Sequence, residues 1–284
     1  MEKLHAAHQQ AMCQLLEELD RVCKALNIPY MLFAGSMLGA VRHQGFIPWD
    51  DDLDVILLRK DYDRLLNEAE QVLDSEKFYL QKEFSDHWPM FFSKLRLNNT
   101  TCLEKYHPKD SQTHQGIYID IFPCDNCRDT EFGRKLQFWS SKVVIAKALH
   151  ARGYETHSRK KKLFMQLCRL LPNKLFLAMT KGGREDSSKV HSFLGGSSSY
   201  GKSVYPRKYF LSQVQGDFEG KSYPIPAGYD RLLRILYGNY HQLPPEEKRL
   251  CKQHAVLIDP EQSYEAYAHY RDGMEFDVHT RSIR

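Results

Sequence analysis

The 284-residue chain has no long hydrophobic run, no strong excess of charge and no secretory signal. No window reaches about 18 consecutive apolar residues, so no membrane-spanning helix is expected. Met1 to Asp20 lacks an uninterrupted apolar core with a cleavage site, which predicts a cytoplasmic protein. The net charge of +4 and the lack of a basic stripe interleaved with aromatics argue against nucleic acid as a partner. The 40 cationic side chains still suit phosphate-bearing substrates or an anionic membrane face.

The seven cysteines are an odd number without a regular spacing, which predicts reduced thiols rather than a disulfide framework. Cys124-Asp-Asn-Cys127 has the spacing of half a zinc site, but no second pair follows downstream. Cys102 or a distant histidine would complete such a site only through folding. We therefore favour ordinary thiols, with zinc as the alternative.

The composition, 42% hydrophobic and 27% charged, is that of a globular protein with a sizeable core. The sequence contains no internal repeat or low-complexity tract. Its character changes near residue 130, from alternating short strands and helices to longer helices. We expect an α/β catalytic core over residues 1–127 and a mostly helical half over 128–284 that completes the donor site and shapes the acceptor site, unless the two form one integrated domain.

Hydrophobic periodicity predicts the elements of the first part. Expected helices cover 4–27, 36–42 and 61–73, and expected strands cover 30–34, 53–58, 78–82, 91–97, 100–104 and 116–122. Asn98-Asn99 is expected to form a hairpin turn, and Pro123 to end the strand before it. Further on we expect helices at 132–149, at 159–181 with a break at Pro172, and at 229–237, with a loop over 182–200.

Three carboxylates occupy strand positions where they would be costly without a counter-charge. Asp52 and Asp54 alternate at the start of a strand, so they share a face about 6–7 Å apart. Asp120 lies on another strand between two isoleucines, and a lone buried charge there is expensive. If the two strands pair, the three acids converge. The alternative is a solvated acidic strand end with Asp120 bonded to a lysine, but we favour a site for Mg²⁺, or alternatively Mn²⁺.

Gly35-Ser36 lies between a predicted strand and a predicted helix. Such a turn offers free backbone N–H groups and the positive end of a helix dipole to a phosphate. Arg42, at the end of the same short helix, has the forked geometry that meets phosphate oxygens. His43 could do the same, although a surface or capping imidazole is the favoured reading.

The stretch from Gly35 to Val55, GSMLGAVRHQGFIPWDDDLDV, closely resembles the signature of the LicD family of phosphotransferases. That family includes bacterial phosphocholine transferases and is related to fukutin and fukutin-related protein. The resemblance continues through 116–123, 218–230, 237–240 and 243–249. It departs at Asn239, where many relatives carry Asp, and over about 130–215, where it is poor.

The resemblance implies a nucleotidyltransferase-like fold, a small mixed sheet flanked by helices, in which Asp52, Asp54 and Asp120 are the catalytic, metal-binding acids. The implied reaction moves phosphocholine or a polyol phosphate from a CDP-linked donor, such as CDP-choline, to a sugar hydroxyl, with release of CMP. The acceptors implied are lipopolysaccharides, teichoic acids, capsules or other glycans, including lipid-linked ones. Asp120 either assists deprotonation of the hydroxyl or is a metal ligand alone.

Other residues are candidates for substrate contacts in such an enzyme. Lys94 and Arg96 alternate on one predicted strand, where they either meet donor phosphates or form a solvated face. The segments that contain Tyr229, Asp230 and Asn239 could wall the donor head group. If the donor carries choline, tyrosines or Trp49 could hold the quaternary ammonium by cation–π attraction, with core packing as the alternative.

The basic run Arg159-Lys160-Lys161-Lys162 precedes apolar residues. It either rests on the inner leaflet of an anionic membrane, as a peripheral contact, or starts a solvated helix whose apolar side packs inside. Two other functions compete with transfer of a substituted phosphate. One is a nucleotidyltransferase that makes an NDP-activated sugar or alcohol, and the other is a catalytically silent glycan-binding protein.

Overall fold

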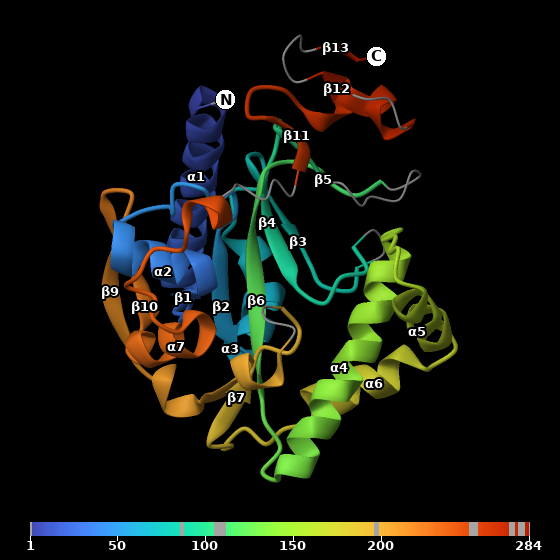
Figure 1. Ribbon diagram of the computed structural model, residues 1–284. Coiled ribbons are helices and arrows are strands. Elements are labelled where there is room, and N and C mark those ends of the chain that lie inside the picture. Colours follow the sequence, from blue (N-terminus) through green and yellow to red (C-terminus); the bar gives the residue numbers. More distant parts are fainter. Residues whose placement is uncertain are drawn as a thin grey trace.

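The computed structural model of the protein describes residues 2–85, 88–104, 112–195, 199–249, 255–272, 276–277 and 282–283. Its centre is a mixed sheet in the order β1-β2-β6-β4-β3, to which β7 is added on β6 and β8 on β7 (Figure 1). The strands of this sheet are β1 (Met31–Leu32), β2 (Asp54–Leu58), β3 (Phe78–Gln81), β4 (Ser93–Leu97), β6 (Tyr118–Asn126), β7 (Lys189–His191) and β8 (Val204–Pro206). β2 and β6 run parallel, and the other pairs are antiparallel. The predicted α/β class with a mixed sheet is confirmed.

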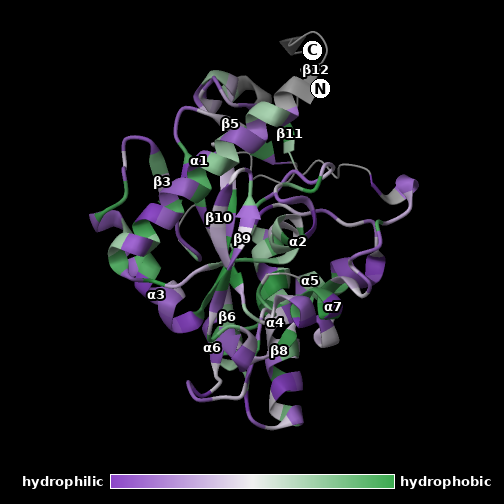
Figure 2. Ribbon diagram, turned by 90° about the vertical axis from the view of Figure 1, so that its left-hand side faces the viewer, coloured by the Kyte–Doolittle hydropathy of each residue, from purple (hydrophilic) through white to green (hydrophobic). Residues whose placement is uncertain are grey.

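Helices cover the sheet on both faces. Figure 2 shows α1 (Glu2–Leu26) and α3 (Arg59–Glu68) on one side, with α2 (Ala34–His43), α4 (Glu131–Ala151), α5 (Arg159–Arg169) and α7 (Tyr229–Tyr237) on the other. In the chain, α6 (Asn173–Lys181) follows α5. Strands outside the main sheet pair as β5 (Thr101–Glu104) with β11 (Ala255–Asp259), β9 (Gln213–Phe218) with β10 (Lys221–Pro226), and β12 (Phe276–Asp277) with β13 (Ser282–Ile283).

The apolar stripe predicted for the first helix is the side of α1 that packs on the sheet. Met12, Leu15, Leu16 and Leu19 are buried there, and α1 contacts β4 and β6. Each such side chain contributes about 1.5–3 kcal/mol by burial. The main hydrophobic cluster extends from Ala11 to Ala255, so it draws on both parts of the chain. The boundary near residue 127 stays a prediction.

Residues 131–181 form a helical arm of α4, α5 and α6 beside the sheet (Figure 1). Thr130 Oγ1 caps α4 by accepting from Gly133 N, and Ser158 Oγ caps α5 by accepting from Lys161 N. The break between α5 and α6 falls before Asn173, as Pro172 predicted. A small cluster of Val143, Ala146, Met165 and Cys168 holds α4 against α5.

Two predictions about the strands are wrong. Thr101–Glu104 does not form a hairpin with β4; it pairs with β11, because both edges of β4 are taken by β3 and β6. Pro123 does not end β6, which continues to Asn126. On that edge of β6, pairing with β4 ends at Ile121 and pairing with β7 begins at Asp125. Pro123 lies between these two ladders, so its missing N–H removes no hydrogen bond from either one.

The second half contains more strand than expected. Its helical description holds for residues 131–181, but the predicted loop over 182–200 contains β7, and the hairpin β9–β10 follows. That hairpin turns at Glu219-Gly220, and both residues have positive φ, 49° and 75°. A two-residue turn with this twist joins antiparallel strands well, and glycine adopts it without strain.

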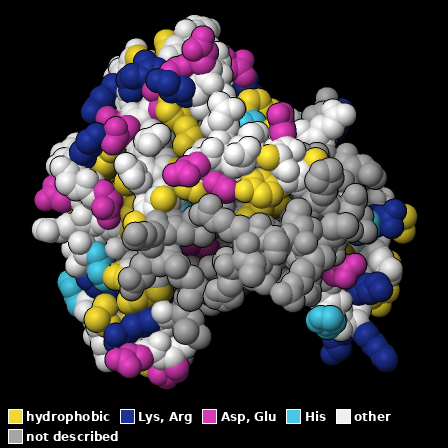
Figure 3. Space-filling model, turned by 90° about the horizontal axis from the view of Figure 1, so that it is seen from above, with side chains coloured by type: hydrophobic (Ala, Val, Ile, Leu, Met, Phe, Trp, Pro, Cys, Tyr) yellow, Lys and Arg dark blue, Asp and Glu magenta, His cyan; other side chains and the backbone are white. Residues whose placement is uncertain are grey.

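The surface seen from above carries both signs of charge, with Lys, Arg, Asp and Glu intermixed among the residues drawn in colour (Figure 3). Within the described part of the chain, no helix is both long and apolar enough to cross a bilayer.

Candidate active site at the paired ends of β2 and β6

Asp54 and Asp120 are neighbours at the first paired position of two parallel strands. They are aligned in register on β2 and β6, and the Asp120 N–H donates to the Leu53 carbonyl at 2.9 Å. Neighbouring strands lie about 4.8 Å apart, and aligned residues of a parallel pair point to the same face. Asp54 and Asp120 therefore converge as the sequence predicted, but Asp52 lies in the loop before β2, and the three predicted acids do not form a group whose ligand atoms all lie within 4.8 Å of one another.

The loop before β2 adds more carboxylates. Asp50, Asp51 and Asp52 are half-buried, and each offers an oxygen within 4.8 Å of the others. Among the described residues, this is the one group of three or more potential ligand side chains gathered so closely. The cluster therefore extends beyond the predicted Asp52 to its two preceding neighbours, and the unbroken run of aspartates was its signal.

The carboxylates of this site repel one another. Burial raises the pKa of the Asp54 carboxyl well above its ordinary value, and the charges of Asp52, Asp120 and Asp50 raise it further. Burial also raises the pKa of Asp120, although Lys94 opposes the shift. Several oxygen donors with too little positive charge around them fit a hard divalent cation, which prefers carboxylate ligands.

Lys94 lies inside the protein and is paired with Asp120. Its Nζ is 2.9 Å from Asp120 Oδ1 and 3.6 Å from Glu104 Oε1, and the side chain is 1% exposed. It also lies over the Tyr118 ring, 3.0 Å from the centroid. Burial lowers the pKa of this ammonium, and the two carboxylates oppose that shift. Lys94 is thus part of the acidic site.

Arg96 shares the face of Lys94, as predicted, but its guanidinium is engaged in the interior. Nε donates to Gln81 Oε1 and Nη1 to the Gly116 carbonyl, each at 2.7 Å, and Nη2 lies 3.8 Å from Glu104. Because the guanidinium of this buried side chain is already bonded to these partners, we do not place Arg96 at a donor phosphate. Neither Lys94 nor Arg96 lies on a solvated strand face.

Glu104 is the shared partner of this buried basic group, and sequence reasoning missed it. Burial alone would raise the pKa of its carboxyl, but Lys94, Arg152 and Arg96 lower it to about 2. Arg152, the residue that follows α4, donates to Glu104 at 2.9 Å. Glu104 therefore ties the helical arm to the site. No local pattern marks it, because its partners are distant in the sequence.

Gly35 and Ser36 stand in the first turn of α2, which begins at Ala34 rather than at Ser36 as expected. A Cβ on Gly35 would lie 2.6 Å from Asp50 Oδ2, so a larger residue there would require the Asp50 carboxylate to move. The buried Ser36 Oγ accepts a hydrogen bond from Asp54 N at 2.8 Å. The turn thus contacts both parts of the acidic cluster.

A cavity of about 600 Å³ opens beside the cluster. Its wall includes Gly35, Arg42, Trp49, Asp50, Tyr237 and Asn239. Arg42 Nη1 donates to the Tyr240 carbonyl at 2.7 Å, and His43 contacts the Trp49 ring edge-on at 6.3 Å. The side chain of Tyr237 is 44% exposed. The structure thus brings Arg42, Trp49 and Asn239 together at the predicted site, whereas His43 contacts Trp49 but does not line the cavity.

Tyr229 and Asp230 begin α7 and do not line this cavity. Asp230 accepts from the Tyr240 hydroxyl at 3.0 Å and from Arg234 Nε on the next turn. Tyr229 is half-buried against the main core. The geometry gives Asp230 a positioning role for the Tyr240 segment, which forms the cavity wall.

Cys124 and Cys127 lie in the core, away from solvent. Burial raises the pKa of both thiols, that of Cys127 to about 12. Buried thiols with such values are poor ligands and poor nucleophiles.

The candidate active site therefore consists of acids at the paired ends of β2 and β6 and a cavity beside the start of α2. Residues 27–149 match the family model described as LicD/FKTN/FKRP, nucleotidyltransferase domain. The chain is also 28% identical over 268 residues to the lipopolysaccharide cholinephosphotransferase LicD of Haemophilus influenzae, a match that covers 87% of this chain and 95% of that protein. A shorter stretch of 48 residues, 17% of this chain, is 46% identical to 18% of an uncharacterized protein of Rickettsia prowazekii. The chain is thus similar to LicD over most of its length, and the LicD-type domain spans residues 27–149.

Proposed function

We propose that the chain transfers phosphocholine, or another substituted phosphate such as a polyol phosphate, from a CDP-linked donor to a sugar hydroxyl of a cell-surface glycan or its precursor. The supporting observation is the alignment of Asp54 with Asp120 beside the cavity at Gly35 and Asp50. The 28% identity to a lipopolysaccharide cholinephosphotransferase supports phosphocholine transfer as the chemistry of this site.

In the proposed reaction, the sugar oxygen forms a bond to the phosphorus that carries the choline or polyol. The bond from that phosphorus to the oxygen bridging it to CMP breaks, and CMP leaves with the electron pair. The hydroxyl proton passes to a base. Phosphoryl transfer of this kind depends mainly on positioning and on electrostatic stabilisation.

Asp52, Asp54 and Asp120 would hold Mg²⁺ or Mn²⁺, which would supply positive charge to the diphosphate of the donor. Lys94 fixes the orientation of Asp120 through the 2.9 Å ion pair. Held in this way, the Asp120 carboxylate is also our candidate for accepting the proton of the sugar hydroxyl.

The cavity residues would receive the donor. Arg42 is held at the wall by its bond to the Tyr240 carbonyl, and its remaining N–H groups would meet phosphate oxygens of the donor. Tyr237 and Trp49 present aromatic rings for a quaternary ammonium. One side of Trp49 already faces Arg249, whose guanidinium carbon lies 5.8 Å from the ring centroid, so Tyr237 is the more accessible ring.

The test is to incubate the purified chain with CDP-choline, CDP-glycerol and CDP-ribitol and a panel of glycan acceptors, and to measure CMP release together with labelling of the acceptor. A parallel reaction with CTP and phosphocholine measures pyrophosphate. CMP release that depends on an acceptor supports the proposal. Pyrophosphate release without CMP would show a nucleotidyltransferase instead, and no product with any donor would favour a silent glycan-binding protein.

We also propose that the arm is a peripheral contact with an anionic membrane. Leu163, Leu167 and Leu170 are 57%, 56% and 84% exposed along one stripe of α5 and its end. On this helix it is Met165 and Cys168 that are buried, so most of the apolar side does not pack inside. The basic residues 159–162 precede this stripe, which gives the helix the charge that complements anionic lipid.

A further inference from the structure

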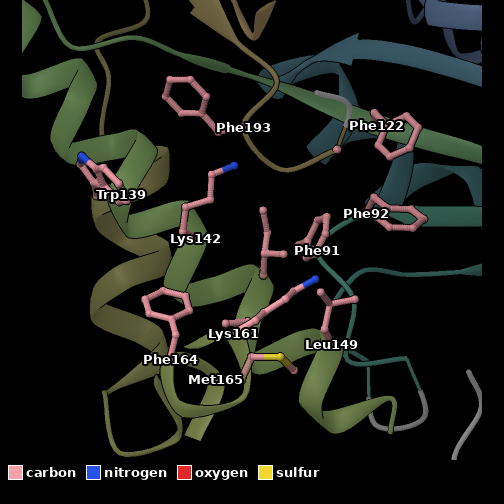
Figure 4. A pocket seen from close by; sticks show the side chains of 13 residues that line it. Phe91, Phe92, Phe122, Trp139, Lys142, Leu149, Lys161, Phe164, Met165 and Phe193 are labelled. Atoms are coloured by element: carbon pink, nitrogen blue, oxygen red, sulfur yellow. The ribbon is translucent and has the colours of Figure 1, made fainter. Parts of the chain in front are cut away.

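A second cavity, of about 610 Å³, lies between the helical arm and the sheet. Figure 4 shows Phe91, Phe92 and Phe122 on the sheet side. The facing wall comes from α4 and α5 and includes Leu149 and Met165. Phe164 and Trp139 also line it, and both are partly exposed, 42% and 64%. This cavity is separate from the one beside Asp50 and shares no lining residue with it.

Two ammonium groups interrupt the apolar lining. Figure 4 shows Lys142, from α4, and Lys161, from α5, extending into the space. Lys142 lies over the Phe138 ring at 4.3 Å, and Lys161 donates to the Tyr154 hydroxyl at 2.9 Å. Among the described residues, no carboxylate lines this cavity. Apolar walls with two cations and no anion fit a molecule that is apolar along its length and negative at one end.

The cavity lies on the same face of the sheet as the acids. Asp120 and Phe122 are two residues apart on β6, so their side chains point to one face about 6–7 Å apart. Phe92, just before β4, packs against Phe122 at a tilt, with ring centroids 4.9 Å apart. The cavity wall therefore begins one side chain away from the acidic site.

We propose that this cavity binds the hydrocarbon chain of an anionic lipid, with the head group against Lys142 and Lys161. Its role as the anchor site of a lipid-linked acceptor rests on the proposed function, whereas the binding itself does not. A fatty carboxylate and an isoprenoid phosphate share the chemistry required. The exposed stripe of α5 lies next to the entrance at Phe164, so a lipid can enter from a membrane surface that touches the arm.

The first experiment is direct binding of 11-(dansylamino)undecanoic acid to the full chain without donor or cation, followed by fluorescence. Displacement then compares oleate, farnesyl phosphate and monoolein, which is the uncharged control. We expect the two anions to displace the probe and monoolein to do so roughly tenfold less well, because it lacks the charge-assisted contact. A series of alkyl phosphates should gain roughly fourfold in affinity per methylene until the cavity is filled.

Variants locate the site. Lys142→Gln and Lys161→Gln should each weaken oleate binding roughly tenfold and leave monoolein unchanged. The matched control is Lys135→Gln, which replaces an exposed lysine on α4, the helix of Lys142. It should change the binding of neither oleate nor monoolein. Ala146→Trp should abolish binding of oleate, farnesyl phosphate and monoolein, because the larger side chain fills the cavity. Leu149→Ala, which enlarges the cavity, is the second variant in case Ala146→Trp does not fold.

Absence of probe binding to the wild type, or equal losses in Lys142→Gln and Lys135→Gln, would overturn the proposal. So would unchanged binding in a folded Ala146→Trp variant. Farnesyl phosphate bound more tightly than oleate identifies an isoprenoid source, and the reverse order identifies a fatty acid. Lipid binding without acceptor-dependent CMP release would leave this site in place and refute only the proposed transfer.

Discussion

Ser36 Oγ accepts a hydrogen bond from the backbone N–H of Asp54 at 2.8 Å, and this bond joins the start of α2 to the start of β2. The glycine before it leaves room for the Asp50 carboxylate, and β2, which follows, begins at Asp54. A single buried hydroxyl thus fixes the spacing between the turn and the acids.

Replacement of Ser36 by Ala should lower stability by about 1–3 kcal/mol, because the Asp54 N–H would be left buried without an acceptor. Urea denaturation measures the change. Ser222→Ala, which removes an exposed hydroxyl bonded to Asp217, is the control and should cost less than about 0.5 kcal/mol. Equal stability of Ser36→Ala and wild type would contradict the structural role of this bond.

Replacement of Asp54 by Ala should reduce CMP release by about a hundredfold or more, because a proposed cation ligand is lost from the site. The fold should survive, since the change removes repulsion from Asp52 and Asp120 rather than a core contact. Circular dichroism and the melting temperature check the fold. Asp129→Ala, an exposed acid on the loop before α4, is the matched control. Most of the activity retained in Asp54→Ala would refute the assignment.

Addition of Mg²⁺ should raise the melting temperature of the wild type after treatment with EDTA. A ligand at a concentration 100 times its dissociation constant raises the free energy of unfolding by about 2.7 kcal/mol. For a chain of this size, that corresponds to a rise of several degrees in the melting temperature. The same titration in Asp54→Asn should give a much smaller rise, because one carboxylate no longer contributes. An identical rise in both proteins would place the cation elsewhere, whatever the activity shows.

Replacement of Lys94 by Met should destabilise the protein by about 3–5 kcal/mol, because Asp120 and Glu104 would lose their shared buried cation. In a double-mutant cycle, adding Asp120→Asn to Lys94→Met should recover part of that loss, since the unpaired charge is removed. Additive losses in the cycle would show that the 2.9 Å pair does not couple the two residues energetically.

Replacement of Leu167 and Leu170 by Glu should abolish sedimentation of the chain with vesicles that contain anionic phosphatidylglycerol. These side chains are exposed, so the fold should not change. Binding of the wild type should fall with salt, because each basic residue near an anionic surface contributes about 1 kcal/mol that is screened. Leu211→Glu, an exposed leucine outside the arm, is the matched control. Equal binding to neutral vesicles would contradict the role of charge.

The elements with strong local signals were predicted within a few residues. The first helix, the aspartate-bearing strand and the break at Pro172 follow from periodicity, chain direction and proline geometry, which act over a few neighbouring residues. The hairpin at Asn98-Asn99 and the strand end at Pro123 were wrong because each depends on which distant strand occupies an edge. Strand pairing is non-local, and a single chain carries little record of it.

By itself, the sequence determined the chemistry available to this protein: a run of acids after a Gly-Ser turn, a third acid between isoleucines, and a basic start to an apolar helix. Only the tertiary structure decided that Asp54 and Asp120 share a register, that Lys94 and Arg96 are buried around Glu104, and that the apolar side of α5 stays exposed. The reason is that residue type is local, whereas burial and the partner of a charge depend on the packing of segments that are far apart in the chain.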